Sequence, residues 1–167
     1  MSPNPLATAY IGLGSNLGDR AANLLMGIRG VLDAGLQVTR LSQIYETEPV
    51  ETFAQPPFLN MVIELGSNLP PPKELMERLL RIEQTLGRIR DQAKGPRTID
   101  LDLLLYGNAT SDSELITLPH PRLPYRRFVL VPLAEIAPTL VHPTLNKTIS
   151  ELLEALDDNS TVKLWIP

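Results

Sequence analysis

Two acidic residues, Asp100 and Asp102, lie one residue apart in the otherwise apolar run GPRTIDLDLLLY. Gly-Pro precedes the run and Gly-Asn follows it, which predicts a short strand rather than a helix. Side chains alternate between the two faces of a strand, so both aspartates would share one face. Ile99, Leu101 and Leu103 would share the other face and enter a core.

Two carboxylates this close repel each other unless a positive charge lies between or in front of them. Mg²⁺ meets this need, because it favours one or two carboxylates together with waters and substrate phosphates. The alternative is a pair of solvated aspartates on an exposed strand face. The neighbouring Arg97 and the poor strand propensity of aspartate favour the metal site.

The positive charges are concentrated near these aspartates. The net charge of −4 argues against a general nucleic-acid binder. An acidic protein with clustered cations instead suggests a small polyanion bound with a metal, although some of the arginines suit the solvated face of a helix equally well. Ten of the 15 Lys and Arg residues fall in two segments: Lys73, Arg78, Arg81, Arg88, Arg90, Lys94 and Arg97, then Arg122, Arg126 and Arg127.

Arg88, Arg90 and Arg97 bracket a single loop. Guanidinium groups match phosphate oxygens with two hydrogen bonds, and a loop can bring them onto a phosphoryl group when substrate is bound. Together with Asp100 and Asp102, they supply what phosphoryl transfer requires, namely positioning, metal binding and charge neutralisation.

Three further features have a structural and a functional interpretation. The turn GLGSNLG does not match the phosphate-binding pattern GxGxxG, since Gly18 comes one residue late. It also lacks the GK[ST] of a Walker A loop. We therefore expect a strand-to-helix turn with Asn16 bonded to the backbone. Phe58 and Asn60 would share a strand face that suits a flat heterocycle, although a strand Phe is usually core. His120 lies between two prolines, and a lone His is more often structural.

The composition indicates a soluble globular protein and one domain over residues 1–167, with 43% hydrophobic and 20% charged residues. The absence of cysteine excludes disulfides, thiolate metal sites and a catalytic thiol. The N-terminus has no basic signal-like segment, and no apolar run reaches membrane-spanning length, so we expect a soluble intracellular protein.

The predicted order of elements is strand, helix, strand, strand, helix, strand. This order is typical of the α+β ferredoxin-like split βαβ fold, an antiparallel sheet with both helices on one face. A C-terminal extension of helix and strand would follow. The predicted segments are a strand at 7–13, a helix from Asp19 to Gly35, extended chain at 38–45, a loop at 47–57, a strand at 58–65, a helix at 73–86, a loop at 88–97, the aspartate strand, an apolar stretch at 128–136, a helix at 149–156 and a strand at 162–166.

Several motifs follow one another over nearly the whole chain. They are YIGLGSNLGDR, FLN, RIE, GRIR, GPRTIDLDLLLYG, LPHPRL and RFVLVPLAEIAP. In this order they resemble the 6-hydroxymethyl-7,8-dihydropterin pyrophosphokinases of folate biosynthesis. The resemblance implies a cytoplasmic, monomeric ferredoxin-like enzyme that acts on small molecules, without nucleic acid or membrane. It implies transfer of pyrophosphate from ATP to the pterin hydroxymethyl group, with release of AMP.

The resemblance also implies roles for individual residues. Asp100 and Asp102 would hold two Mg²⁺ ions, and Arg88 and Arg97 would act on the transferring group. The implied ATP-binding residues are Glu83, Arg88, Arg90, Arg97, His120 and Arg126. The implied pterin-binding residues are Thr47, Val50, Phe58, Asn60 and Phe128.

This sequence departs from the common family pattern at two positions. Phe58 stands where Tyr is common, which keeps ring stacking and loses a phenolic hydrogen bond, and Lys94 stands where an aromatic residue often precedes Gly-Pro-Arg. Two alternative functions stay open. A metal-dependent phosphohydrolase would use the same aspartates and arginines with water as nucleophile. A regulatory ferredoxin-like module would bind a nucleotide without turnover and would need no metal pair.

Overall fold

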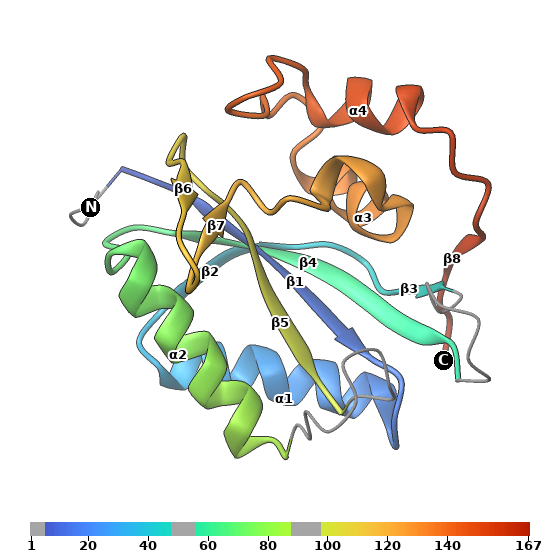
Figure 1. Cartoon of the computed structure of the whole chain (residues 1–167). Helices are drawn as coiled ribbons and strands as arrows, with labels where there is room; N and C mark the ends of the chain where they lie inside the picture. Colours follow the sequence, from blue (N-terminus) through green and yellow to red (C-terminus); the bar gives the residue numbers. More distant parts are fainter. Residues whose placement is uncertain (1–5, 48–55, 88–97) are drawn as a thin grey trace.

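A six-stranded antiparallel sheet forms the middle layer of the protein. The computed structural model describes residues 6–47, 56–87 and 98–167. The strands are β1 (Ala9–Ser15), β2 (Gln37–Leu41), β3 (Tyr45–Thr47), β4 (Phe58–Gly66), β5 (Asp100–Tyr106) and β8 (Val162–Leu164). Their order is β5-β1-β4-β3-β8, and β2 also pairs with β4 (Figure 1).

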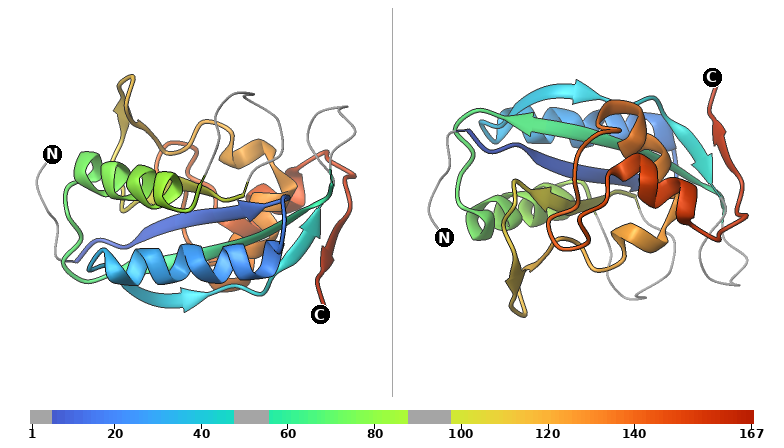
Figure 2. Two further views of the ribbon diagram at one scale, coloured as in Figure 1. Left: turned by 90° about the horizontal axis from the view of Figure 1, so that it is seen from below. Right: turned by 90° about the horizontal axis from the view of Figure 1, so that it is seen from above.

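Helices α1 (Arg20–Asp33) and α2 (Pro72–Thr85) lie side by side on one face of the sheet (Figure 1; Figure 2, left). Each helix connects two strands of the sheet, α1 following β1 and α2 following β4. This arrangement confirms the predicted ferredoxin-like split βαβ fold.

The ends of α1 form as the sequence predicts. The Asp19 carboxylate caps the helix by accepting a hydrogen bond of 3.1 Å from the Ala22 backbone N–H, and Gly35, with φ of +80°, follows its end. Leu24 and Val31 are fully buried. Leu25 is 63% exposed. Only some of the apolar residues of α1 therefore enter the core, and others lie on its exposed side.

The inward stripe predicted for α2 is confirmed for Leu75, Leu79 and Ile82, which are all buried. Pro72 occupies the first turn, where its missing N–H leaves no helical bond unmade. These residues join the sheet in one core cluster that includes Leu13 and Ile99.

The opposite face of the sheet carries α3 (Arg127–Ile136), and α4 (Ile149–Ala155) packs on α3 (Figure 1). A second core cluster joins both helices to the sheet. Hydrogen bonds from three residues attach α3 to the neighbouring strand region. Arg40 donates to the Ile136 carbonyl at 2.7 Å, and Glu135 accepts from the Tyr45 hydroxyl at 2.6 Å and from the Gln43 backbone N–H at 3.1 Å. Burial, together with the Glu135 carboxylate, raises the pKa of Tyr45 to about 12.

The C-terminal half contains elements that the sequence did not predict. The apolar stretch 128–136 is helical, and a small hairpin of β6 (Ser111–Asp112) and β7 (Thr117–Leu118) precedes the short 3₁₀ helix Leu123–Tyr125. The expected last strand is present as β8, which pairs with β3. Of the helices in the described ranges, none is both long and apolar enough to cross a membrane.

We expect Gly30→Val to destabilise the fold. A Cβ atom at Gly30 would lie 2.6 Å from Ile82 Cγ2, where α1 and α2 meet. The branched Ile82 side chain cannot withdraw easily, so the free energy of unfolding should fall by about 1–3 kcal/mol. Urea denaturation measures this loss. Leu25→Val, on the exposed side of the same helix, is the matched control, and equal losses in the two variants would contradict the close packing at Gly30.

Candidate functional site

The strand register places the predicted metal and pterin residues in one row across the sheet. Gly14 of β1 pairs with Asp100 of β5 on one side and with Asn60 of β4 on the other. Asn60 in turn pairs with Tyr45 of β3. Paired residues in antiparallel strands point to the same face, so Asp100 and Asn60 flank a position that has no side chain.

The two aspartates share a face, as the sequence predicts. Asp102 pairs with Gly12, two residues from the row of Asp100 and Gly14. Asp100 is buried, with 8% of its surface exposed, whereas Asp102 is exposed. Leu101, which lies between them, points into the core under α1 and α2. The carboxylates therefore lie on the face that carries α3.

Glu83 of α2 holds the strand that carries the aspartates. Its carboxylate Oε1 accepts a hydrogen bond of 2.8 Å from the Leu101 backbone N–H. Only 3% of Glu83 is exposed. The bond reaches β5 from the core side, at the residue between Asp100 and Asp102, so it positions the backbone on which both side chains depend.

The aspartate pair suits a hard divalent cation. Its donors are all carboxylate oxygens, which Mg²⁺ prefers, and Mg²⁺ commonly completes its coordination with waters and substrate phosphates. Within residues 6–47, 56–87 and 98–167, no cluster of three or more His, Cys, Asp or Glu side chains could hold a metal. Asp100 and Asp102 fit a metal shared with a phosphate substrate better than a closed structural metal site.

Asn60, near the start of β4, and Thr47, at the end of β3, form a buried polar pair. The Asn60 Nδ2 donates to the Thr47 hydroxyl at 2.6 Å. Thr47 pairs in register with Phe58, so the predicted pterin residues of β3 and β4 are adjacent. A Cβ atom at Gly14 would lie only 2.8 Å from Asn60 Oδ1. The amide therefore occupies space that only glycine leaves open.

Phe128 and Arg126 lie at the start of α3. The Arg126 guanidinium carbon is 5.4 Å from the centre of the Phe128 ring, a cation–π distance. Phe128 packs on the second core cluster, which includes Val62 of β4. Val62 lies two residues beyond Asn60 and four beyond Phe58, so all three share one strand face. The rings of Phe58 and Phe128 therefore lie on the same side of the sheet.

His120 is attached to the strand that carries the aspartates. Its backbone N–H donates to the Leu104 carbonyl at 2.9 Å, and its Nδ1 accepts from the Arg122 N–H at 3.2 Å. Burial, then the positive charges of Arg126 and Arg122, lower the pKa of His120 to about 4. The imidazole is therefore neutral near pH 7, with its proton on Nε2.

Four of the predicted site residues, Val50, Arg88, Arg90 and Arg97, lie outside the described residues. The remaining ones divide between β3, β4, β5, α2, the segment leading into α3 and the first turn of α3.

Sequence reasoning missed the two glycines of β1. It expected the first strand to end at Leu13 and GLGSNLG, residues 12–18, to form a turn, whereas β1 continues to Ser15 and therefore contains Gly14 as well as Gly12. The available signal was their spacing of two, which puts both on one strand face where another group approaches closely. Asn16 does bond a backbone group, as expected, but the bond leaves the turn, because its Nδ2 donates to the Pro56 carbonyl at 3.1 Å.

Comparison with known proteins agrees with this arrangement. Residues 10–138 match the family model described as 7,8-dihydro-6-hydroxymethylpterin-pyrophosphokinase. A 2-amino-4-hydroxy-6-hydroxymethyldihydropteridine pyrophosphokinase of Synechocystis is 45% identical over 156 residues, covering 93% of this chain and 79% of the relative. The Bacillus subtilis protein of the same name is 42% identical over 158 residues, covering 94% and 89%.

Larger proteins contain a similar region. The folic acid synthesis protein fol1 of Pneumocystis carinii is 41% identical over 90% of this chain, which spans only 20% of that protein. Among solved structures, the HPPK-DHPS of Plasmodium falciparum with pteroate has a TM-score of 0.71 and 14% identity, covering 92% of this chain and 45% of that chain. This last likeness concerns the fold. On the family model and the close relatives, the chain belongs to the 7,8-dihydro-6-hydroxymethylpterin-pyrophosphokinase family.

Proposed function

We propose that this protein transfers the pyrophosphate of ATP to the hydroxymethyl oxygen of 6-hydroxymethyl-7,8-dihydropterin, a step of folate biosynthesis. The products are AMP and the pterin diphosphate. The observation that carries the proposal is the row of Asp100, Gly14 and Asn60 across three adjacent strands. It puts a carboxylate site suited to a metal-bound triphosphate beside an amide suited to a heterocycle.

Asp100 and Asp102 would hold two Mg²⁺ ions together with the phosphates of ATP. The bound ions would neutralise charge on the triphosphate and lower the pKa of the attacking hydroxyl. The protein's own contribution is geometric. Glu83 holds the backbone of Leu101 at 2.8 Å, so the two carboxylates keep their spacing when substrate arrives.

The pterin would bind over β4, between the rings of Phe58 and Phe128. Aromatic faces suit a flat heterocycle, and phenylalanine stacks without needing a polar partner. Asn60 offers an amide oxygen beside Gly14, while its amide nitrogen is oriented by Thr47. A preoriented amide can recognise the hydrogen-bonding edge of the ring, because its own rotation is already restricted. We assign Val50 to the same subsite.

ATP would bind over β5 and the start of α3. The neutral His120 can donate from Nε2, since its Nδ1 already accepts a backbone N–H. Arg126 can pair with phosphate oxygens. Glu83 would support this pocket from the opposite face of β5, through the Leu101 backbone N–H, and we assign charge neutralisation to Arg88, Arg90 and Arg97. The proposed partners are small molecules, and the monomeric state and cytoplasmic location remain predictions.

A ³¹P NMR time course with Mg-ATP, with and without the pterin, tests the proposed reaction. Pterin-dependent formation of AMP and a pterin diphosphate is expected. Release of phosphate without pterin would indicate a phosphohydrolase, and binding of ATP without turnover would indicate a nucleotide-binding module. Either result would overturn the proposal.

We expect Asp102→Asn to lower kcat by about 10³-fold, because a neutral amide holds a divalent cation far less well than a carboxylate. The melting temperature should change little, since Asp102 is exposed. Asp112→Asn, an exposed aspartate of β6, is the control. Turnover near that of the unmodified protein would contradict the metal assignment.

Gly14→Ala should raise the KM for the pterin by about tenfold to a hundredfold. The new Cβ would lie 2.8 Å from Asn60 Oδ1 and would displace the amide that Thr47 orients. Gly12→Ala is the matched control, because its Cβ would meet only Leu104 at 3.6 Å. Steady-state kinetics with each substrate varied separately distinguish the two variants. Similar pterin KM values in Gly14→Ala and Gly12→Ala would refute the role of the open space at Gly14.

The neutral state of His120 predicts a pH dependence of stability. Its pKa falls from 6.5 to about 4 on folding, so its contribution to stability is complete above pH 6.5 and is lost as pH falls towards 4. His120→Gln should therefore lose less of its free energy of unfolding over that range. Urea denaturation at several pH values measures this, and parallel curves for the two proteins would contradict the shift.

A further inference from the structure

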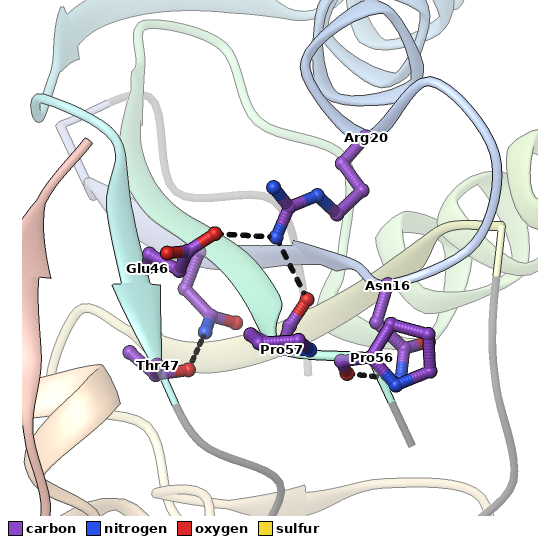
Figure 3. A network of polar contacts seen from close by, with 7 residues as sticks. Asn16, Arg20, Glu46, Thr47, Pro56 and Pro57 are labelled. Carbon is purple, nitrogen blue, oxygen red and sulfur yellow. Dashed lines mark hydrogen bonds and ion pairs between the residues drawn. The ribbon is translucent and has the colours of Figure 1, made fainter. Parts of the chain in front are cut away.

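The N-terminus of α1 is joined to the polypeptide on both sides of residues 48–55. The Arg20 guanidinium donates from one nitrogen, Nη1, to the Glu46 carboxylate at 2.7 Å and to the Pro57 carbonyl at 2.9 Å. Glu46 belongs to β3, and Pro57 directly precedes β4. Figure 3 shows Arg20 reaching down between these two acceptors.

Asn16 makes a second connection from the same turn. It is 1% exposed, and its side-chain amide donates to the Pro56 carbonyl at 3.1 Å (Figure 3). Two side chains of the motif GSNLGDR therefore hold consecutive carbonyls, those of Pro56 and Pro57. The motif, which sequence reasoning treated as a simple turn, organises the start of β4.

The bonds of Arg20 lie on the opposite side of the sheet from the proposed pterin subsite. Glu46 pairs with Leu59, whose side chain enters the core under α1 and α2. Thr47 pairs with Phe58, one position further along. Because successive strand residues alternate between faces, fixing Glu46 and Pro57 from one face sets where Thr47 and Phe58 lie on the other.

The ion pair is well placed to have a measurable effect. The Arg20 and Glu46 side chains are 25% and 36% exposed, so they are partly shielded from water. A charge-assisted bond shared with a backbone carbonyl is more restrictive than an exposed ion pair. The other arginine of α1, Arg29, pairs with Asp33 on the open surface, with side chains 72% and 64% exposed.

We propose that Arg20 is a positioning residue for the pterin subsite. It acts through Glu46 and the Pro57 carbonyl, and it sets the spacing of Thr47 and Phe58 without touching substrate. The inference rests on the proposed function, since it assumes that the pterin binds at Phe58 and Asn60.

The test compares Arg20→Ala with Arg29→Ala in steady-state kinetics, varying ATP and 6-hydroxymethyl-7,8-dihydropterin separately. Arg20→Ala should raise the pterin KM by about tenfold and leave the ATP KM within about twofold. Arg29→Ala should change neither. Arg20→Lys, which keeps the charge but has a different donor geometry, should restore part of the lost affinity.

A double-mutant cycle tests the proposed route through Glu46. If Arg20 acts through this carboxylate, Arg20→Ala and Glu46→Ala together should raise the pterin KM less than the product of their separate effects. Independent effects of the two substitutions would overturn the proposed coupling. Equal increases in both KM values, or an unchanged pterin KM in Arg20→Ala, would overturn the positioning role.

Asn60→Ala separates this inference from the proposed function. If Asn60→Ala raises the pterin KM and Arg20→Ala does not, only the inference about Arg20 fails. If the unmodified protein shows no pterin-dependent formation of AMP, the proposed function fails first. Thermal melting of each variant accompanies the kinetics, and a lower apparent kcat in Arg20→Ala that follows the unfolded fraction, with both KM values unchanged, would reduce Arg20 to a purely structural role.

Discussion

The antiparallel register of β5, β1 and β4 is the constraint on which the site depends. It aligns Asp100, Gly14 and Asn60 in one row, although these residues lie far apart in the sequence. The middle position must be glycine, because even a methyl group there would meet the Asn60 amide at 2.8 Å. A one-residue slip of either strand would send one group to the other face and dismantle the site.

The two faces of the sheet have different roles. Helices α1 and α2 cover one face and bury most of the apolar strand residues, which gives the strands a rigid support. The other face carries α3 and α4 at one part and the candidate site at another. Contacts made from the supported face then position groups on the functional face, as Glu83 does for the aspartates and as we propose for Arg20.

Much of this could be predicted from the sequence, because periodicity and local signals depend on neighbouring residues. The strand with Asp100 and Asp102, the Asp19 cap and the inward stripe of α2 all follow from such patterns. The helix at 127–136 was missed as a helix, since its apolar residues lack a polar face of helical period and it contains Pro132. The extent of β1 was missed because glycines resemble a turn until a partner strand is known.

The sequence by itself determined the ferredoxin-like order of elements up to β5 and the kinds of chemical groups present, and its motifs identified the family. Only the tertiary structure decided which groups meet: that Glu83 bonds the backbone between the aspartates, that Asn60 occupies the gap at Gly14, and that Arg20 reaches Glu46 and Pro57. Local patterns arise from residues within a few positions of one another, whereas these contacts depend on strand register and on how helices cross the sheet.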